Sequence, residues 1–312
     1  MNILITGIHG FVGGNLVATL RQHHTIYGLD IVFPQKNGIE KTYSWKDLDE
    51  DKLPNIDAII HLAGKAHDTK NQAEAQVYFD VNTKLTERIY DYFLKSSAKK
   101  FIFFSSVKAA ADMVKGEFLT EEVVPEPKGP YGESKIAAEK YIQSHPTEKT
   151  VYILRPCMIH GPGNKGNLNL LYGVVKKGIP WPLGAFENRR TFTSVDNLCF
   201  VVEGLLTKAV PSGIYHMADD EALSTNELIG IICEAMGKKA PIWKINRFFM
   251  EHCAQIGDVL HLPLNTDRLS KLTENYVVSN AKIKNALGIS QMPVRAWDGL
   301  RKTILSFESN KK

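Results

Sequence analysis

A tyrosine and a lysine lie four positions apart in the run Tyr131-Gly132-Glu133-Ser134-Lys135, at the start of a predicted helix. This spacing places the phenol and the ammonium on one face of the helix. An ammonium about 4 Å from a phenol contributes roughly 4 kcal/mol at an effective dielectric of 20, or about three pKa units. We therefore expect Lys135 to bring the pKa of Tyr131 close to neutrality, where a phenol can work as a general acid or base.

The spacing alone does not identify the reactive pair, because Tyr172 and Lys176 repeat it. The first pair, however, is preceded by the apolar run FIFF, which reads as a strand and is followed by two serines. The hydroxyl of Ser106 would then lie at the carboxyl edge of a sheet, where α/β proteins bind ligands. We expect Ser106 to act with Tyr131 and Lys135 in catalysis and also to contact the substrate. Tyr172 and Lys176 should form a solvent-facing helix pair.

Three glycines connect the first predicted strand to a helix, in the run Gly7-Ile8-His9-Gly10-Phe11-Val12-Gly13. In such a turn the first glycine allows a sharp bend, the second lets the backbone approach a pyrophosphate, and the third lets the helix pack on the strand. The negative pyrophosphate then lies at the N-terminus of the helix. The turn predicts a dinucleotide site that includes Gly7, Gly10, Phe11, Val12 and Gly13.

An acidic residue, Asp30, stands at the end of the second predicted strand. A carboxylate about 20 residues beyond the glycines accepts hydrogen bonds from the adenine ribose hydroxyls. No arginine follows it, since the next residues are Ile-Val-Phe-Pro. A 2′-phosphate would meet the carboxylate without a cation to offset it, so the sequence favours NAD over NADP.

Short apolar runs alternate with longer segments of helical period, which is typical of a parallel sheet with crossover helices. The predicted fold is therefore α/β, a doubly wound Rossmann sheet followed by a smaller, mainly helical lobe. The predicted strands are 3–6, 25–29, 58–61, 100–104 and 151–154, and the predicted helices include 11–21, 73–95 and 131–144. After about residue 161, Gly and Pro cluster in GPGNKGN and GIPWPLG. We place the NAD-binding domain at 1–162, with a returning segment near 191–217, and the substrate lobe at 163–312.

The composition argues against several other classes of protein. The chain has 312 residues, of which 44% are hydrophobic, and its net charge of +4 is too small for a nucleic-acid-binding protein. The cysteines form no CxxC pair and predict buried thiols without a metal site or disulfide; they are Cys157, Cys199, Cys233 and Cys253. No stretch is long enough to span a bilayer, and the first residues do not resemble a signal peptide. We expect a cytoplasmic protein without a membrane partner.

Together these motifs resemble the extended short-chain dehydrogenases, often called NAD-dependent epimerases/dehydratases. The resemblance covers nearly the whole chain through TGIHGFVG, HLAG at 61–64, DVN at 80–82, FFSS, YGESK, LRP at 154–156, GPG at 161–163 and RRTFTSVDNL from residue 189. It implies that Tyr131 is the acid/base and that Lys135 holds the nicotinamide ribose and lowers the tyrosine pKa. It also implies that Ser106 hydrogen-bonds the reacting oxygen.

The same resemblance implies further contacts. The dinucleotide would also meet Leu62, Ala63, Gly64, Asn82 and Pro156, with Asp47 and Leu48 near the adenine. Arg190 would bind the substrate pyrophosphate, a role that suits a bidentate guanidinium. Asn167 would face the nucleotide end, and Arg268 is a second candidate for a phosphate contact. Helices 73–95 and 131–144 resemble the dimer surface common in this family, which predicts a homodimer.

Departures from the family pattern narrow the reaction. Dehydratases usually follow the active hydroxyl with Asp-Glu, whereas this chain has Val107 and Lys108, so we do not expect a 4,6-dehydratase. Ala110 and Ala111 occupy the region where many members have Tyr-Gly, and His160 replaces the usual tyrosine before GPG. These changes leave the hydride chemistry intact but alter the wall that would face the sugar.

The runs SSVK, PWPLGAF and NRRTFTSVDNL look most like a bacterial branch that makes surface-polysaccharide sugars. The expected function is that of an NAD-dependent epimerase that transiently oxidises C4 of a UDP-hexose or UDP-N-acetylhexosamine. One alternative is an NAD(P)H-dependent 4-keto reductase of a UDP-4-keto-6-deoxy sugar. Another, of a different class, is a dinucleotide-sensing regulator that keeps the fold without catalysis, since a fold does not fix a function.

Overall fold

The computed structural model of the chain describes residues 1–65, 74–164, 166–262 and 264–309. Its main feature is a parallel sheet of seven strands in the order β3-β2-β1-β4-β5-β6-β9. The strands are β1 (Asn2–Thr6), β2 (Thr25–Leu29), β3 (Lys41–Tyr43), β4 (Ala58–His61), β5 (Lys100–Phe104), β6 (Thr150–Pro156) and β9 (Gly213–Met217). The strand order reverses between β1 and β4. The carboxyl ends of these two strands are therefore the expected ligand site of a doubly wound sheet. The predicted fold class is confirmed.

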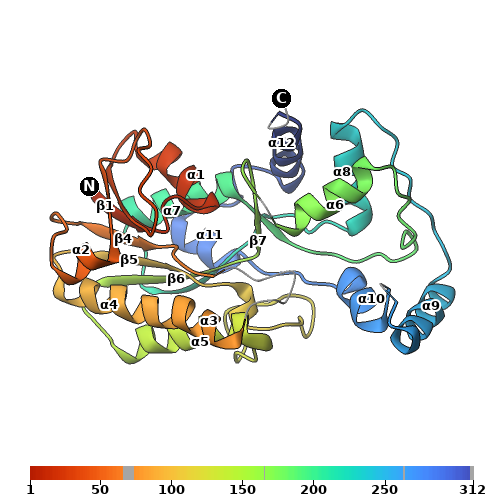
Figure 1. Cartoon of the computed structure of the whole chain (residues 1–312), viewed down its shortest axis with the longest axis horizontal. Helices are drawn as coiled ribbons and strands as arrows, with labels where there is room; N and C mark the ends of the chain where they lie inside the picture. Colours follow the sequence, from red (N-terminus) through yellow and green to blue (C-terminus); the bar gives the residue numbers. More distant parts are fainter. Residues whose placement is uncertain (66–73, 165, 263, 310–312) are drawn as a thin grey trace.

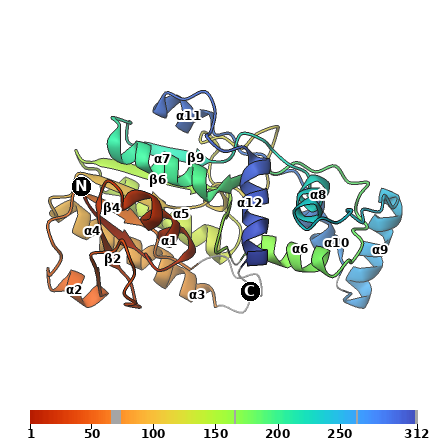
Figure 2. The ribbon, with the colours of Figure 1, turned by 90° about the horizontal axis from the view of Figure 1, so that it is seen from above.

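Helices cover both faces of this sheet (Figure 1). One face carries α1 (Phe11–Leu20), α7 (Val195–Thr207) and α11 (Ala281–Leu287). The other carries α4 (Leu85–Lys95) and α5 (Gly129–Ser144), and the short α3 (Ala75–Tyr78) lies on the same side. A π-helical turn, η1 (Phe79–Lys84), joins α3 to α4, a 3-10 turn, η2 (Val107–Ala109), follows β5, and α2 (Trp45–Asp49) follows β3. The perpendicular view in Figure 2 shows the same layers.

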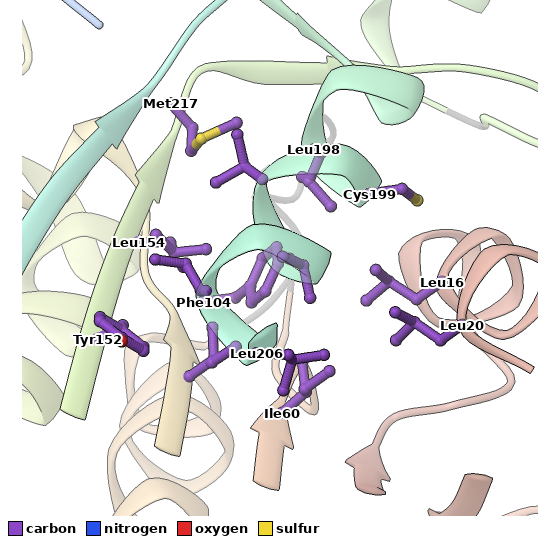
Figure 3. Packing of buried hydrophobic residues seen from close by; sticks show 14 of the residues in the cluster. Leu16, Leu20, Ile60, Phe104, Tyr152, Leu154, Leu198, Cys199, Leu206 and Met217 are labelled. Carbon is purple, nitrogen blue, oxygen red and sulfur yellow. The ribbon is translucent and has the colours of Figure 1, made fainter. Parts of the chain in front are cut away.

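Two apolar cores fill the spaces between the sheet and these helices. Successive strand residues point to opposite faces, so Ile3 and Ile5 enter one core while Leu4 enters the other. Figure 3 shows the first core, in which Leu198 and Leu206 of α7 pack between the strands and α1. Each fully buried leucine stabilises the fold by about 1.5–3 kcal/mol. The packing therefore holds the strand ends, and the loops that follow them, in fixed positions.

The chain leaves the sheet after β6 to build a smaller, mainly helical lobe at the other end of the molecule (Figure 1). This lobe holds a two-stranded parallel sheet of β7 (Met158–His160) and β8 (Phe192–Ser194). Its helices are α6 (Asn167–Lys176), α8 (Thr225–Ala235), α9 (Arg247–Leu260), α10 (Thr266–Thr273) and α12 (Ala296–Ser309). Between β8 and α8 the chain returns to the large sheet as α7 and β9, and after α10 it returns again as α11.

The prediction that Tyr172 and Lys176 form a solvent-facing pair is wrong for Tyr172, which is buried. Tyr172 is only 4% exposed, and its ring contacts Phe307 of α12 at 5.4 Å between centroids. The Lys176 Nζ lies 3.2 Å from the Tyr172 hydroxyl and 3.0 Å from Glu308 Oε1. The tyrosine ring belongs to the core of the lobe because α12 covers it, and the charged groups sit at the rim. This pair joins α6 to α12.

Among the residues that the structure describes, no helix is long and apolar enough to cross a membrane. The cysteine thiols are free, and three of them are buried while Cys253 is partly exposed. Burial raises the pKa of Cys157 to about 12, which keeps this thiol protonated at neutral pH. The described part of the chain shows no group of three or more side chains placed to hold a metal ion.

Candidate active site

The turn between β1 and α1 lies at the strand edge where the sheet order reverses. Gly7 has a φ of +67°, which favours glycine, and a Cβ on it would approach the Ala63 backbone nitrogen to 2.9 Å. A Cβ on Gly13 would lie 2.5 Å from the Ile8 carbonyl oxygen, so only glycine lets α1 pack this closely. Gly10 is the N-cap of α1, and no side chain caps it. The N–H groups of the first turn therefore suit a pyrophosphate, as a dinucleotide site requires.

The carboxylate of Asp30 lies against this turn. Its Oδ2 accepts a hydrogen bond from the His9 backbone N–H at 3.0 Å, and its Oδ1 accepts one from the Ile31 backbone N–H at 2.7 Å. An ionised carboxylate offers about four lone-pair sites, so acceptor positions remain for ribose hydroxyls. Asp30 thus has the position and the chemistry predicted for the residue that holds the adenine ribose.

The loop after β4 is fixed to β1 by one hydroxyl. Thr6 Oγ1 accepts the backbone N–H groups of Leu62 at 3.2 Å and Ala63 at 3.0 Å. A Cβ added to Gly64 would lie 3.2 Å from the Lys135 Nζ. The loop predicted to line the dinucleotide therefore lies directly beside the predicted catalytic lysine.

Asn82 fixes the same loop to helix α5. It is fully buried in the π-helical turn η1, a kind of helical irregularity that is frequent at functional sites. Its Oδ1 accepts the Lys65 backbone N–H at 2.8 Å, and its Nδ2 donates to Ser134 Oγ at 3.0 Å. These bonds make Asn82 a residue that positions the loop and α5 relative to each other.

The three predicted catalytic residues come together beyond the end of β5. Ser106 is the N-cap of η2, and its Oγ accepts the Lys108 backbone N–H at 3.2 Å. Its side chain also hydrogen-bonds that of Tyr131, which lies in the first turn of α5. Lys135 is 6% exposed, one turn further along the same helix. The arrangement joins a hydroxyl, a phenol and a buried ammonium.

A glycine lets helix α5 approach the serine segment. A Cβ on Gly132 would lie 2.5 Å from the Lys108 carbonyl oxygen, closer than real Cβ atoms approach backbone. Gly132 directly follows Tyr131, and Lys108 lies two residues after Ser106. The hydrogen bond between Ser106 and Tyr131 therefore depends on the absence of a side chain at Gly132, where α5 approaches the serine segment.

The expected low pKa of Tyr131 is wrong for this arrangement. Burial raises the pKa of Tyr131 above its usual 10.0, the hydrogen bond from Ser106 opposes that rise, and Tyr78 adds to it. The Lys135 Nζ instead donates to the Phe104 carbonyl oxygen at 2.9 Å. Burial also lowers the pKa of Lys135 to about 8, against an opposing effect of Glu139. Burial therefore outweighs the attraction that the spacing alone predicted.

A buried ion pair that the sequence reasoning missed lies beneath the site. Arg155 of β6 donates to Glu139 of α5 through Nη2 to Oε2 at 2.6 Å and Nε to Oε1 at 3.0 Å. Ser105 Oγ also donates to Glu139. Glu139 follows Lys135 by four residues, a spacing that could have identified it. The carboxylate connects α5 to β5 and β6.

The predicted phosphate residues lie in the second lobe, around α10. Arg190 is half-buried, its Nη2 lies 3.2 Å from Glu274 Oε1, and the same nitrogen donates to the Lys271 carbonyl oxygen in the last turn of α10. Burial lowers the pKa of Arg190, and Glu274 opposes this shift. Arg268 lies on α10 itself and lines a surface hollow with Asn265 and other residues. Whether either guanidinium binds phosphate stays a prediction.

The loop after GPG carries two asparagines of different character. Asn167, the predicted contact to the nucleotide end, is the exposed first residue of α6. Asn164 was missed, although it is 9% exposed and its Nδ2 has no hydrogen-bond partner among the residues that the structure describes. The same loop packs on α1, where Asn15 Nδ2 donates to the Pro162 carbonyl oxygen at 3.2 Å. Asn164 is thus a candidate donor to a ligand, and the asparagine next to GPG was the signal available for it.

Other predicted contacts have structural partners. Asp47 forms a capping box with Ser44 at the start of α2, and its Oδ2 accepts the Ser44 backbone N–H at 2.8 Å. Leu48 is buried in the core on the α4 and α5 side of the sheet. Pro156 ends β6, opposite Met217 of β9. Contact of these residues with a dinucleotide remains a prediction.

The departures at the expected sugar-facing wall are also buried. The His160 Nδ1 lies 3.0 Å from Thr303 Oγ1, so this side chain is directed toward α12. Ala110 and Ala111 pack in a small core that includes Tyr276, whose hydroxyl donates to the Ala111 carbonyl oxygen at 2.7 Å. These residues contribute to packing between the two lobes.

Comparisons with known proteins agree with this geometry. Residues 3–218 match the model of the NAD dependent epimerase/dehydratase family, whose description agrees with the cofactor predicted from Asp30. The chain is 30% identical to a UDP-glucose 4-epimerase of Vibrio cholerae over 262 residues, which cover 78% of each protein.

It is also 27% identical over 308 residues to an N-acetyl-α-D-glucosaminyl-diphospho-ditrans,octacis-undecaprenol 4-epimerase of Escherichia coli O157:H7, covering 93% of this chain and 86% of that one. Among solved structures, a UDP-glucose 4-epimerase of Thermotoga maritima with UDP-glucose superposes with a TM-score of 0.78, at 21% identity and full coverage of both chains. That likeness shows the shared fold.

Replacing Gly132 with alanine should separate Tyr131 from Ser106. The added Cβ would overlap the Lys108 carbonyl oxygen, so α5 must shift, and we expect a fall in kcat of about 100-fold. Gly230→Ala in α8 is the matched control, because a Cβ there meets nothing within 4 Å. Steady-state kinetics of both variants test this prediction. Equal activity of the two variants would show that the close approach is not needed.

Above about pH 8 the enzyme should lose activity because the Lys135 ammonium loses its proton there. The charged form exists below this pKa, so the fall belongs to the alkaline side of the profile of kcat/KM against pH. An arginine has a pKa above about 12 and stays charged throughout this pH range. Lys135→Arg should therefore remove the alkaline fall in activity while it lowers the overall rate. An unchanged alkaline fall in Lys135→Arg would assign it to another group.

Proposed function

Because the chain belongs to the NAD dependent epimerase/dehydratase family, we propose that it is an NAD-dependent 4-epimerase of a hexose or N-acetylhexosamine carried on a diphosphate. A UDP-sugar is the expected substrate. The observation that carries the proposal is the hydrogen bond between Ser106 and Tyr131, beside a buried Lys135 and the glycine turn. Proteins that only sense a dinucleotide do not need this set of three groups.

The side chains of the site would handle the proton at the sugar C4 oxygen. Ser106 would hold that oxygen by a hydrogen bond, and Tyr131 would take its proton and later return it. The Lys135 ammonium, one helical turn away, favours the phenolate while it exists. NAD held at the glycine turn and Asp30 would supply the hydride acceptor and donor for the sugar C4. Because burial raises the pKa of Tyr131, the phenolate that takes this proton needs a nearby positive charge such as the Lys135 ammonium.

The glycine turn and Asp30 fit the dinucleotide by their own chemistry. Gly7 and Gly13 leave no room for a side chain, so the backbone there is shaped for close approach, and α1 presents its N-terminus. Asp30 would accept the ribose hydroxyls. Asn82 and the Leu62 to Gly64 loop would position the nicotinamide end near Lys135.

In this proposal the enzyme recognises its substrates by the diphosphate that they share. The Vibrio relative is named for UDP-glucose, and the Escherichia relative is named for a sugar on undecaprenyl diphosphate. A diphosphate is common to both substrates, and Arg190 has the guanidinium geometry that binds such a group. We propose that Arg190 and Arg268 meet the diphosphate, and that Asn167 and Asn164 lie toward the carrier.

A dehydration reaction has no support at this site. Val107, directly after Ser106, is buried in an apolar cluster, and the Lys108 Nζ pairs with Asp112 at 3.0 Å. No carboxylate therefore occupies the two positions directly after Ser106, where a dehydratase would carry its acid and base for the loss of water. The 4-keto reductase remains the second candidate, because Ser106, Tyr131 and Lys135 serve the same hydride step in one direction.

We further propose a homodimer that uses the outer faces of α4 and α5. The two helices lie side by side on one face of the sheet (Figure 1), which leaves their outer surfaces available to a second copy. Sedimentation velocity at micromolar protein should show a species of twice the mass of the chain. A single species of 34.9 kDa would contradict the dimer.

Tyr131→Phe should lower kcat by about 10²–10⁴-fold, because it removes the group that carries the proton. Tyr172→Phe is the matched control, since Tyr172 and Lys176 have the same spacing but join α6 to α12. The assay follows inversion at C4 of UDP-glucose and UDP-N-acetylglucosamine, with the cofactor content of the purified enzyme measured beside it.

C4 inversion without net consumption of NADH is the expected result. Stoichiometric oxidation of NADH by a 4-keto-6-deoxy UDP-sugar, without inversion, would establish the reductase instead. A Tyr131→Phe protein as active as the wild type would refute catalysis by this tyrosine and favour the dinucleotide sensor.

A further inference from the structure

We propose that the outer face of helix α9 binds the surface of an anionic lipid bilayer. The inference rests on the proposed function and deepens it, because it would bring the site to a sugar that a membrane lipid carries on a diphosphate. The outer face is defined by Phe248, Phe249, Ile256, Val259 and Leu260.

Helix α9 has two apolar faces, and only one of them is covered. Met250, Ala254 and Gly257 face the lobe and are buried. A Cβ on Gly257 would lie 1.8 Å from the Leu264 carbonyl oxygen, so the helix packs tightly on the segment that leads into α10. The inner face thus gives α9 a fixed position without using its other apolar residues.

The outer face is an apolar stripe that also holds the exposed His252, whose ring lies 4.0 Å from that of Phe248 between centroids. Its members are exposed by 68% at Phe248, 59% at Phe249, 54% at Ile256, 76% at Val259 and 61% at Leu260. Their spacing of three, four and seven residues places them on one side of a helix. The polar residues Arg247, Glu251, Gln255 and Asp258 fall on a third side. Bulky side chains gathered in this way mark a surface that binds another apolar body.

The charge around the stripe favours an anionic partner. Residues 238–271 contain six Lys and Arg but three Asp and Glu, a net charge of +3 within a chain whose total is +4. Arg247 directly precedes the two phenylalanines, Lys244 lies four residues before Phe248, and both basic residues are exposed. A helix with an apolar face and basic neighbours is the kind that lies in the headgroup region of an anionic bilayer.

The stripe belongs to the same structural unit as the candidate phosphate contact. α9 and α10 share an apolar cluster that includes Met250, Ala254 and Leu269. Arg190 donates to the Lys271 carbonyl oxygen at the end of α10. Figures 1 and 2 both show α9 at the end of the molecule opposite the seven-stranded sheet. A diphosphate held near Arg190 and a bilayer beneath α9 would therefore contact one rigid pair of helices.

This mode of binding differs from the membrane partner that the sequence argued against. No helix in the described part of the chain is long and apolar enough to cross a membrane, whereas a helix that lies on the surface needs only one apolar face. α9 has 14 residues, too few to cross a bilayer of about 30 Å. Its outer face is nonetheless suited to insertion at the headgroup boundary.

Vesicle sedimentation tests the proposal with the full chain. Wild-type protein is mixed with vesicles of phosphatidylcholine alone or with about a third phosphatidylglycerol. We expect binding to the anionic vesicles, weakened about tenfold or more by Phe248→Ser/Phe249→Ser and by Val259→Asp. Val124→Asp is the matched control, because Val124 is 78% exposed, as Val259 is 76% exposed, but lies outside α9. It should bind like the wild type.

Two activity measurements separate this inference from the proposed function. The Phe248→Ser/Phe249→Ser variant should keep its kcat on soluble UDP-N-acetylglucosamine. Its kcat/KM on N-acetylglucosaminyl polyprenyl diphosphate in the same vesicles should fall about tenfold. The enzyme could turn over neither sugar and yet bind anionic vesicles, with weaker binding in the outer-face variants. That result would refute the proposed function and would still support binding of a lipid bilayer by the outer face.

Three results would overturn the inference. One is wild-type protein that stays in the supernatant with anionic vesicles. Another is a Phe248→Ser/Phe249→Ser variant that binds them as tightly as the wild type. The third is a wild-type oligomer that does not bind vesicles and that the substitutions in the outer face dissociate, as measured by sedimentation velocity. This result would assign the outer face to a second copy of the chain.

Discussion

A single buried carboxylate, Glu139, holds the candidate site together. It lies on α5, receives the guanidinium of Arg155 from β6, and accepts the hydroxyl hydrogen of Ser105 after β5. A fully buried charge is tolerated only when it is paired and hydrogen-bonded, and removal of one partner costs about 3–5 kcal/mol. The pair therefore fixes the helix that carries Tyr131 and Lys135 against the strand end that carries Ser106. The close contact at Gly132 is possible because this pair sets the position of the helix.

Burial then determines the protonation of the site. It lowers the pKa of Lys135 to about 8, and it lowers the pKa of His61, which is fully buried in the same region, to about 3. His61 is thus a neutral hydrogen-bonding group between Thr6 and Thr86 and adds no positive charge beside the lysine. Burial raises the pKa of Tyr131 in the same way. Burial thus shifts the pKa of each group toward its uncharged form, but Lys135 keeps its charge below about pH 8, whereas His61 and Tyr131 are neutral near pH 7.

Sequence reasoning predicted the sheet, and it singled out three candidate groups that the structure brings together, because both have local signals. The strands 25–29, 58–61 and 100–104 were predicted with their observed bounds, since buried parallel strands appear as short apolar runs. The three-residue strands β3, β7 and β8 are too short to show a period. Tyr172 was misplaced because nothing local reveals that α12, more than a hundred residues later, covers it. The pKa of Tyr131 was misjudged because spacing reports a neighbouring charge but not the loss of water around it.

The return of the chain to the large sheet has a consequence for how the protein acquires its structure. The core on the α1 side includes residues of α7 and β9 as well as Ile283, Leu287 and Met292. A growing chain that ended near residue 162 would have β6 without its neighbour β9 and one face of the sheet largely uncovered. Long-range contacts of this kind form slowly, and exposed sheet faces aggregate before they are covered. The boundary between the two lobes thus separates two kinds of site in the folded molecule, but it does not separate two segments that fold independently. The large sheet is complete and covered only after β9 and α11 have been synthesised.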